Sequence, residues 1–292
     1  MPATVAALAL SSCAVSGTSG EDSSVGNQAS AFSRLPSTAA MRECGPNSSV
    51  TVRPGTLTVA TDAPAYPPWF LDNDPANGKG FEGAVARAVS ERLGYTPEKV
   101  RFVTVPFREA LIPGAKNFDF NINQFTISDE RRGAVDFSSP YYAVAQSVIS
   151  LANNPAAQAN SLAELATFRL GAQQGSTSFG AIVTTLHPAI TPTAFDTNDE
   201  AKQALVEGKI DALVVDFPTG YQIAGNQIPG SVLVGQFPRP NDVTEFYGLV
   251  LAKGSRMTPC VSAAVDSLYA DGTLDKLAVQ WLSNQTGARV LE

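Results

Sequence analysis

Histidine is nearly absent from this chain, which contains one such residue, His187, among 292. A Ser-His-Asp triad or a histidine-based metal site would have to use it, and it precedes a proline in "TLHPAI", where we expect a surface loop. The chain also lacks G-x-S-x-G, H-E-x-x-H, phosphate-loop and dinucleotide-binding patterns. These absences argue against the common classes of hydrolase, metalloprotease and nucleotide-dependent enzyme. We expect no enzyme activity, no metal and no cofactor.

Positive charge and long apolar runs are scarce as well. The 20 Lys and Arg residues are outnumbered by 27 Asp and Glu residues, which gives a net charge of −7 and a pI near 4.8. A protein that binds nucleic acid through phosphate contacts has the opposite sign or a dense basic stripe, so we expect no nucleic-acid partner. No apolar run approaches the roughly 18 to 20 residues that span a bilayer.

The N-terminal stretch "ATVAALALSSCAVSG" is a short apolar run followed by small residues and Cys13. It resembles the end of a bacterial lipoprotein signal, with Leu10 to Cys13 as the lipobox. The resemblance implies that residues 1–13 are a signal ending at a lipidated Cys13. No Lys or Arg precedes the apolar run, as a secretory signal normally requires. Either the start was assigned too late or the match is accidental, and a buried N-terminal helix is the alternative.

Residues 14–51 are rich in Ser, Gly, Thr, Ala and Asn, without a sustained helical or strand period. Such a segment cannot bury enough apolar surface to offset its ordering entropy, so we expect a flexible tether between a lipid anchor and a folded body. This arrangement predicts an extracytoplasmic protein held at the bacterial cell membrane. In an oxidising compartment Cys44 and Cys260 are expected to form a disulfide, and two unrelated buried thiols are the alternative.

The remaining sequence alternates between strand-like and helix-like segments. Strands are expected at 56–61, 100–105, 118–122, 168–173, 191–195, 211–216, 231–237 and 246–255. Helices are expected at 81–94, just before "LIPG", and at 178–186, 198–208, 259–272 and 273–285. This alternation predicts an α/β protein with mostly parallel sheets.

The strands fall into two groups, which predicts two lobes. We expect lobe I to comprise 52–143 plus 246–288 and lobe II to comprise 144–245, with hinge crossings near 141–146 and 241–247. Ligands of open α/β sheets bind outside the carboxyl ends of the strands, so those ends should line a cleft between the lobes.

Several fragments occur in the order typical of one protein family: "TDAPAYPPWF", "GFEGAVARAVSERLG", "TISDERRGAVDFSSPYY", "GAQQGSTS", "DALVVDFP" and "FYGLVLAKGS" followed by "ADGTLDKLAVQWL". The chain resembles the extracytoplasmic polar amino-acid-binding proteins of ABC importers, solute-binding protein family 3. The resemblance covers nearly all of residues 55 to 284. It implies a type II periplasmic binding protein fold, with two lobes that close on a ligand about two hinge strands.

The segment "NQFTISDERR" follows an expected strand and supplies hydroxyls and a guanidinium. Arg131 can hold a carboxylate with two parallel N–H bonds, which a Lys cannot do. By resemblance Arg131 binds the ligand's α-carboxylate, and Thr126 touches both α-groups. Asp129 and Glu130 suit a helix N-terminus. A surface salt bridge between Arg131 and Asp136 is the alternative.

Lobe II is expected to supply the rest of the α-group site. In "QQGSTS", which includes Gln173, a strand turns into a helix, and Ser176 and Thr177 there should complete the carboxylate clamp. Asp216 ends an apolar strand, where a carboxylate needs a cationic partner. By resemblance Asp216 binds the α-ammonium group, and a helix N-cap is the alternative.

By resemblance Asp62 and Tyr66 meet the side chain of the ligand. Phe107 supplies a second aromatic face, so that the two rings could lie on either side of the ligand. A carboxylate flanked by aromatic rings suits an amide or a cation better than an acid. Gln124 stands where the family often has Gly or Ser, and should narrow the pocket. Arg108 could turn inward and favour an acidic ligand, but a solvated surface position is the simpler expectation.

The sequence therefore predicts a monomeric, lipid-anchored solute-binding protein that captures a polar amino acid for an ABC permease and its ATPase. Two alternatives stay open. Some relatives of this fold are dehydratases of cyclic acids, and a raised-pKa carboxyl in the cleft without an α-ammonium clamp would identify such an enzyme. The other alternative is a ligand-sensing module that signals through a partner.

Overall fold

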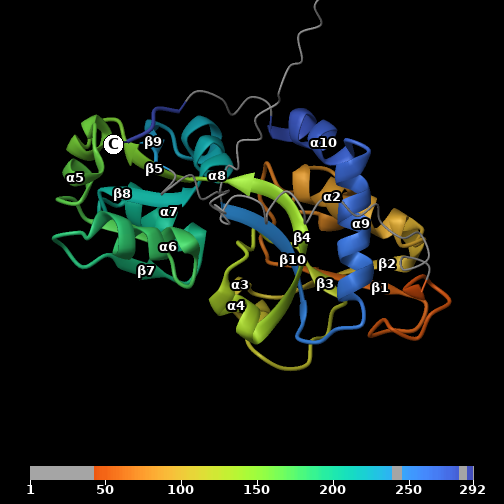
Figure 1. Ribbon diagram of the computed structural model, residues 1–292. Coiled ribbons are helices and arrows are strands. Elements are labelled where there is room, and N and C mark those ends of the chain that lie inside the picture. Colours follow the sequence, from red (N-terminus) through yellow and green to blue (C-terminus); the bar gives the residue numbers. More distant parts are fainter. Residues whose placement is uncertain (1–42, 239–244, 283–287, 292) are drawn as a thin grey trace, which may run out of the picture. The chain divides into compact units, whose positions relative to one another are not determined.

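The computed structural model describes residues 43–238, 245–282 and 288–291 (Figure 1). The predicted signal, its Cys13 and most of the predicted tether lie outside these residues. Within them, ten strands form two five-stranded sheets. The first sheet has the order β2 (Val100–Thr104), β1 (Leu57–Thr61), β3 (Phe120–Asn121), β10 (Glu245–Ala252) and β4 (Val135–Val144). The second has the order β7 (Thr193–Phe195), β6 (Leu170–Gln173), β8 (Ala212–Asp216), β5 (Gln146–Leu151) and β9 (Ser231–Gln236).

The sheets are mixed, which corrects the prediction of mostly parallel sheets. In the first sheet β1 pairs in parallel with β2 and β3, whereas β10 runs antiparallel to β3 and β4. In the second sheet β6 is parallel to β7 and β8, whereas β5 is antiparallel to β8 and β9. The chain passes from the first sheet to the second between β4 and β5, and returns between β9 and β10. Each of these four strands is antiparallel to the strands that it pairs with.

Helices pack on both sheets. Lobe I, the first sheet with its helices, includes α2 (Phe81–Arg92), α3 (Phe107–Ala110), α4 (Asp129–Ala134), α9 (Thr258–Ala270), α10 (Thr273–Leu282) and the 3-10 turns η2 (Pro75–Asn77) and η3 (Pro97–Lys99). Lobe II, the second sheet with its helices, includes α5 (Leu162–Leu165), α6 (Thr177–Ala181), α7 (Asn198–Val206) and α8 (Phe217–Gln222). It also includes the 3-10 turn η4 (Pro155–Gln158) and the π-helical segments η5 (Ile182–Leu186) and η6 (Ile223–Gln227). The expected α/β fold is confirmed, while the residue limits predicted for the two lobes stay a prediction.

Helical spacing of apolar residues explains how α2 attaches to its sheet. Phe81, Val85 and Val89 recur every four residues along this helix, and each is fully buried. They pack in one apolar cluster with Leu57 and Val59 of β1. A second cluster includes Ala60 of the same strand, so this strand is covered on both faces. The second sheet likewise contributes to two apolar clusters.

A disulfide between Cys44 and Cys260 joins the start of the described chain to α9. The predicted pair is therefore confirmed, and the alternative of two separate thiols is not what the structure shows. Cys44 also presents its carbonyl oxygen to the hydroxyl of Tyr95, 2.9 Å away. Both contacts fix the N-terminal segment to the helical side of lobe I. Because the bridge closes a loop of 216 residues, it removes much conformational freedom from the unfolded chain.

The last described residues return to lobe II, a feature that the sequence did not predict. The backbone N–H of Gln236 donates to Arg289, and that of Leu291 donates to Gln236, at 2.8 and 2.9 Å. Leu291 is fully buried in the apolar cluster that contains Val148 and Val214. The helix α10, which precedes this tail, packs on α2 and α9 of lobe I. The C-terminal end therefore contributes to both lobes.

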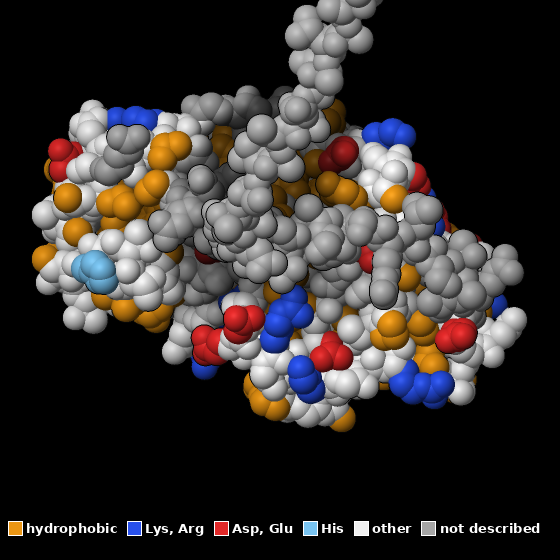
Figure 2. Space-filling view, in the orientation of Figure 1, with side chains coloured by type: hydrophobic (Ala, Val, Ile, Leu, Met, Phe, Trp, Pro, Cys, Tyr) orange, Lys and Arg blue, Asp and Glu red, His pale blue; other side chains and the backbone are white. Residues whose placement is uncertain are grey.

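Side chains of mixed charge are exposed on the face shown in Figure 2. Acidic and basic groups are interspersed with polar and apolar ones over the part of this face that the structure describes. His187, at the end of η5, is exposed, as expected for a surface loop. No helix within the described ranges is long and apolar enough to cross a membrane.

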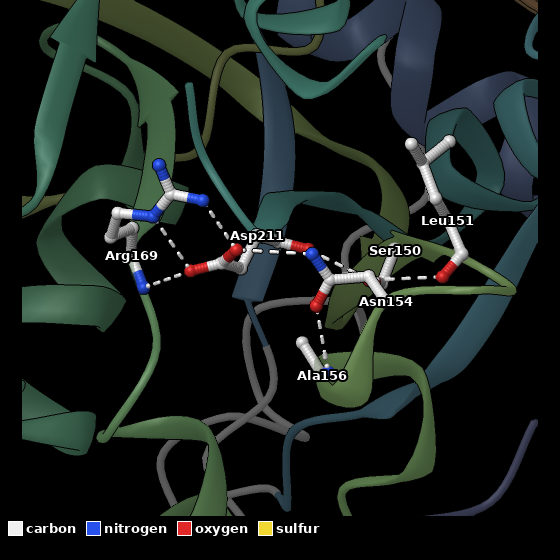
Figure 3. Close-up of polar contacts among 6 residues, drawn as sticks. All are labelled: Ser150, Leu151, Asn154, Ala156, Arg169 and Asp211. Carbon is white, nitrogen blue, oxygen red and sulfur yellow. Dashed lines mark hydrogen bonds and ion pairs between the residues drawn. The ribbon is translucent and has the colours of Figure 1, made fainter. Parts of the chain in front are cut away.

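A network around Asp211 ties three strands of lobe II together (Figure 3). The Asp211 carboxylate accepts hydrogen bonds from the backbone and guanidinium of Arg169, which precedes β6, at 2.7 to 2.9 Å. It also accepts one from Asn154 at 3.0 Å, while its backbone carbonyl accepts one from Ser150 of β5 at 2.7 Å. The bonds from Arg169 lower the pKa of this carboxyl to about 2. The network joins the start of β8 to its neighbours β5 and β6.

We predict that Asp211→Ala lowers the free energy of unfolding at pH 7 by about 1 to 2 kcal/mol, since the charge-assisted bonds belong to a partly exposed pair. Because the folded pKa lies below the unfolded value, this contribution is complete above about pH 4 and is lost as the pH falls toward 2. Urea denaturation between pH 2.5 and 7 measures it. Glu207→Ala, which removes an exposed partner of Lys209, is the control and should have little effect. Equal stabilities of Asp211→Ala and the control at pH 7 would contradict the prediction.

Candidate functional site

A pocket between the two lobes collects nearly all the predicted site residues. It contains about 810 Å³ of empty space, open solvent included. Nine of the ten predicted ligand-binding residues line it: Asp62, Tyr66, Phe107, Gln124, Arg131, Gln173, Ser176, Thr177 and Asp216. The tenth, Thr126, is 4% exposed and lies behind this lining.

Arg131, in α4, connects the lobes at this pocket. Its Nη1 donates to the carbonyl oxygen of Thr126 at 2.7 Å, and its Nη2 donates to that of Gly175, in lobe II, at 2.8 Å. Asp136 instead contacts Lys253, at 3.4 Å, so the alternative salt bridge with Arg131 does not form. A guanidinium has five N–H donors, so further donors remain for a ligand carboxylate. Arg131 can therefore hold an anion and both lobes together.

The start of α4 follows from local capping. The hydroxyl of Ser128 accepts from the backbone N–H of Arg131 at 3.2 Å, and Asp129 and Glu130 occupy the first turn. These carboxylates therefore lie at the helix N-terminus, as expected, where they complement its dipole. Ser128 acts as the N-cap, which orients the turn that carries Arg131.

Asp216 ends β8 and precedes α8. It occupies the N-cap position of α8, but its side chain makes no capping hydrogen bond. Its Oδ1 instead accepts from Nε2 of Gln146 at 2.9 Å. The pKa of Asp216 is raised to about 7. Burial is the main cause and the nearby Glu245 carboxylate adds to it, while Tyr247, Gln146 and Arg131 oppose the shift. A carboxylate with these surroundings gains from a cationic partner.

Glu245 and Gln146 belong to the same polar network, and sequence analysis missed both. Nε2 of Gln146 donates to Glu245 as well, at 2.8 Å, and its amide oxygen accepts from Ser178 at 2.6 Å. Thr177 lies 3.1 Å from Thr126 and 3.3 Å from Glu245, oxygen to oxygen. Two acidic side chains therefore share one amide where β5, β8 and β10 meet. Gln146 and Glu245 are the first residues of the apolar strands β5 and β10, and Asp216 is the last residue of β8. A polar side chain at the end of an apolar strand is the signal that identified Asp216.

Asp62 and Phe107 form the lobe I side of the pocket. The Asp62 carboxylate accepts from the backbone N–H of Ala63 at 2.7 Å and from that of Phe107 at 3.0 Å. The ring of Phe107 stacks on Phe125, with centroids 4.8 Å apart, and the guanidinium carbon of Arg131 lies 5.7 Å from its centroid. Phe107 is 7% exposed. It therefore packs against Arg131 in addition to lining the pocket, a contact that the sequence did not predict.

A buried acidic residue, Glu82, lies behind Gln124. Its carboxylate accepts from the backbone N–H of Gln124 at 2.7 Å, from the Gln124 side-chain amide and from the hydroxyl of Tyr141. Burial raises the pKa of Glu82 to about 7, against the effect of these donors. Gln124 has a left-handed φ of 48°, a conformation that Gly adopts without strain. The hydrogen bonds that Gln124 donates to Glu82 hold it in that conformation.

The remaining predicted residues belong to lobe II. Ser176 caps α6 by accepting from the backbone N–H of Phe179 at 3.1 Å, and Gln173 donates to the carbonyl of Asp196 at 3.1 Å. Arg108, in α3, extends across to Gln174, at 2.8 Å, and does not line the pocket. Among the residues that the structure describes, no group of three His, Cys, Asp or Glu side chains could hold a metal ion.

The raised pKa of Asp216 predicts a pH-dependent stability of the ligand-free protein. The folded protein retains a proton on Asp216 between about pH 4 and pH 7 that the unfolded chain has released. The free energy of unfolding therefore falls as the pH rises through this window, by up to about 1.4 kcal/mol per pH unit for one group. Asp216→Asn should flatten the slope, as measured by denaturant unfolding from pH 4 to pH 8. Identical slopes for both proteins would contradict this.

Known proteins resemble this chain in sequence and in fold. The chain is 26% identical, over 249 residues, to the L-arginine-binding protein of Pseudomonas aeruginosa, covering 77% of this chain and 90% of that protein. Its fold matches an ancestral arginine-binding protein bound to glutamine, with a TM-score of 0.65 and 31% identity over 78% of this chain and 97% of that one. It also matches an ancestral amino acid-binding protein described as a precursor of cyclohexadienyl dehydratase, with a TM-score of 0.64 and 30% identity over 77% and 94% of the two chains.

The family model adds a match to most of the chain. Residues 57–284 match the model of the bacterial extracellular solute-binding proteins, family 3. The matched range includes both sheets and every residue predicted to line the ligand site. It excludes the N-terminal segment, so it does not bear on the predicted lipid anchor. The chain belongs to the bacterial extracellular solute-binding proteins, family 3.

Proposed function

We propose that this protein binds a polar amino acid in the pocket between its lobes and delivers it to an ABC permease with its ATPase. The observation that carries the proposal is a pocket with one guanidinium, Arg131, and one desolvated carboxylate, Asp216. An α-amino acid carries an anion and a cation on one carbon, so its site needs a partner of each sign. The names of the similar proteins, which bind arginine or glutamine, support this ligand class.

The two lobes contribute different parts of the proposed site. Arg131, with its bonds to Thr126 and Gly175, would hold the α-carboxylate, assisted by Ser176 and Thr177 at the start of α6. Asp216 would hold the α-ammonium group. Because these groups come from different lobes, the ligand would stabilise the closed arrangement.

The side chain of the ligand would extend toward Asp62 and Tyr66. The Asp62 carboxylate bonds two backbone N–H groups and has lone pairs left to accept from a ligand amide or cation. A polar amino acid with an amide or basic side chain therefore suits this end of the pocket. We also propose that Cys13 carries a lipid that holds a monomer at the outer side of the cell membrane, as the lipobox resemblance implies.

A dehydratase is the second candidate, since the pocket contains a carboxyl of raised pKa and one structural match is described as an enzyme precursor. The same carboxyl fits a binding protein, because a desolvated carboxylate has a raised pKa until a cation pairs with it. The adjacent Arg131 also provides the α-carboxylate partner of an amino acid. Binding without chemistry is therefore the function that we propose.

A thermal-shift screen against the twenty amino acids and common amines tests this function. A ligand at 100 times its Kd stabilises the folded protein by about 2.7 kcal/mol, which is well within detection. Mass spectrometry of the bound compound after release should return it unchanged. A conversion product would support the dehydratase, and the absence of any stabilising amino acid would refute the proposal.

Arg131→Ala and Asp216→Ala are each expected to abolish high-affinity binding. Each leaves one ligand charge desolvated and unpaired, which costs about 2 to 5 kcal/mol, or roughly a thirtyfold to several-thousandfold loss of affinity. Calorimetry with the best ligand from the screen measures the loss. The control is Arg108→Ala, which removes another arginine contact between the lobes outside the pocket and should change the affinity little. Near-normal affinity in Arg131→Ala would overturn the proposed clamp.

Asp62→Asn should change which amino acid is preferred rather than whether one binds. The substitution removes the negative charge at the side-chain end and leaves Arg131 and Asp216 in place. Basic ligands should therefore lose more affinity than amide ligands, and calorimetry with arginine and glutamine compares the two. An equal loss for both ligands would show that Asp62 does not face the ligand side chain.

A further inference from the structure

Tyr66, which lines the pocket from lobe I, is also held from lobe II. The ammonium of Lys202, in α7, lies 4.6 Å from the centre of the Tyr66 ring. The same ammonium pairs with Asp199, one turn earlier in α7, at 2.7 Å. The Asp199 carboxylate also lies close enough to the Tyr66 hydroxyl to influence its ionisation. One tyrosine from lobe I therefore contacts two charged side chains of opposite sign on a single helix of lobe II.

The burial of Lys202 distinguishes the contact from an ordinary surface ion pair. The Lys202 side chain is 16% exposed and also donates to the amide oxygen of Gln227 at 2.9 Å. Lys209, a few residues later in the chain, is 71% exposed. A cation over an aromatic ring is attracted more strongly when it is desolvated, so Lys202 has a stronger hold on its ring than a solvated lysine would have.

Lys202 contacts Tyr66 without itself lining the pocket. Thr197 and Asn198, which precede Asp199, line the pocket, whereas Asp199 and Lys202 do not. Burial raises the pKa of the Tyr66 hydroxyl, and the neighbouring Asp199 carboxylate raises it further. The Lys202 ammonium therefore holds the Tyr66 ring from lobe II without taking part in the pocket wall.

We propose that Asp199 and Lys202 are positioning residues that lock Tyr66 against lobe II when the lobes are closed, and so set the side-chain selectivity and the release rate of the ligand. The effect on ligand selectivity rests on the proposed function, whereas the contact between Tyr66 and α7 exists without a ligand. Tyr66 contributes to the wall next to Asp62, so a ring held in one place excludes side chains that do not fit. Since the contact joins the lobes, opening must break it before the ligand leaves.

The lock can be tested without any ligand by measuring how fast each lysine reacts with acetic anhydride, using mass spectrometry. In the wild-type protein Lys202 should react more slowly than Lys209. Tyr66→Leu should raise the acetylation rate of Lys202 by roughly 2- to 30-fold, because this range corresponds to the loss of one cation–π contact. The acetylation rate of Lys209 should stay unchanged. An unchanged Lys202 rate in Tyr66→Leu would overturn the lock.

The role in release is tested by the dissociation rate of the best amino acid from the screen. Lys202→Gln should raise this rate by roughly 2- to 30-fold, and the same substitution in Tyr66→Leu should add nothing, because its partner is already absent. Tyr66→Phe, which keeps the ring and loses the hydroxyl next to Asp199, should have an intermediate effect. Lys209→Gln, the matched control, should leave the rate unchanged.

The two lysine variants also separate positioning from general destabilisation. Lys202→Gln should change the ratio of affinities for glutamine and arginine, which a purely structural role would not do. Additive effects of Lys202→Gln and Tyr66→Leu, or an unchanged ratio, would overturn the proposal. If no amino acid binds the wild-type protein, the proposed function fails, and the acetylation rates still decide whether the lock exists.

Discussion

One amide group holds two carboxylates where the chain passes between the sheets. Gln146, the first residue of β5, donates from its Nε2 to Asp216 of lobe II and to Glu245 of lobe I, at 2.9 and 2.8 Å. Burial raises the pKa of Asp216, and the like charge of Glu245 adds to the shift. The neighbouring guanidinium of Arg131 compensates part of this charge. The strands β5, β8 and β10 thus bring Gln146, Asp216 and Glu245 together, next to the guanidinium of Arg131.

The spacing of apolar residues and the position of turn residues predicted most helices and strands, because an element that buries one face repeats its apolar residues with a fixed period. The direction of strand pairing was wrong, since it depends on where the chain enters each sheet, which no local pattern encodes. The strand expected at 118–122 shortens to two residues in β3, because Asp119 turns its carboxylate to the backbone N–H groups of Val52 and Thr58. Such contacts between distant segments appear only once the chain has folded.

Site residues were predictable where a polar side chain ends an apolar strand, as Asp216 does, because a charge at the end of a buried strand needs a partner or a ligand. Glu82 was missed, since an acidic residue in the first turn of a helix already complements the helix dipole. Lys202 was missed because its spacing from Asp199 is that of an ordinary helical ion pair. In both cases the functional signal lies in the partner across the fold, Gln124 or Tyr66, and not in the sequence around the residue.

The C-terminal return to lobe II has a consequence for how the protein is made. Lobe II is built from the middle of the chain, yet Leu291 is fully buried in one of its apolar clusters. Lobe I likewise needs β10 and the sulfur of Cys260 before its sheet and its disulfide are complete. Neither lobe can therefore complete its core until these late segments have joined it. The order in which the two halves finish folding is set by these segments, and not by the order in which their first strands are made.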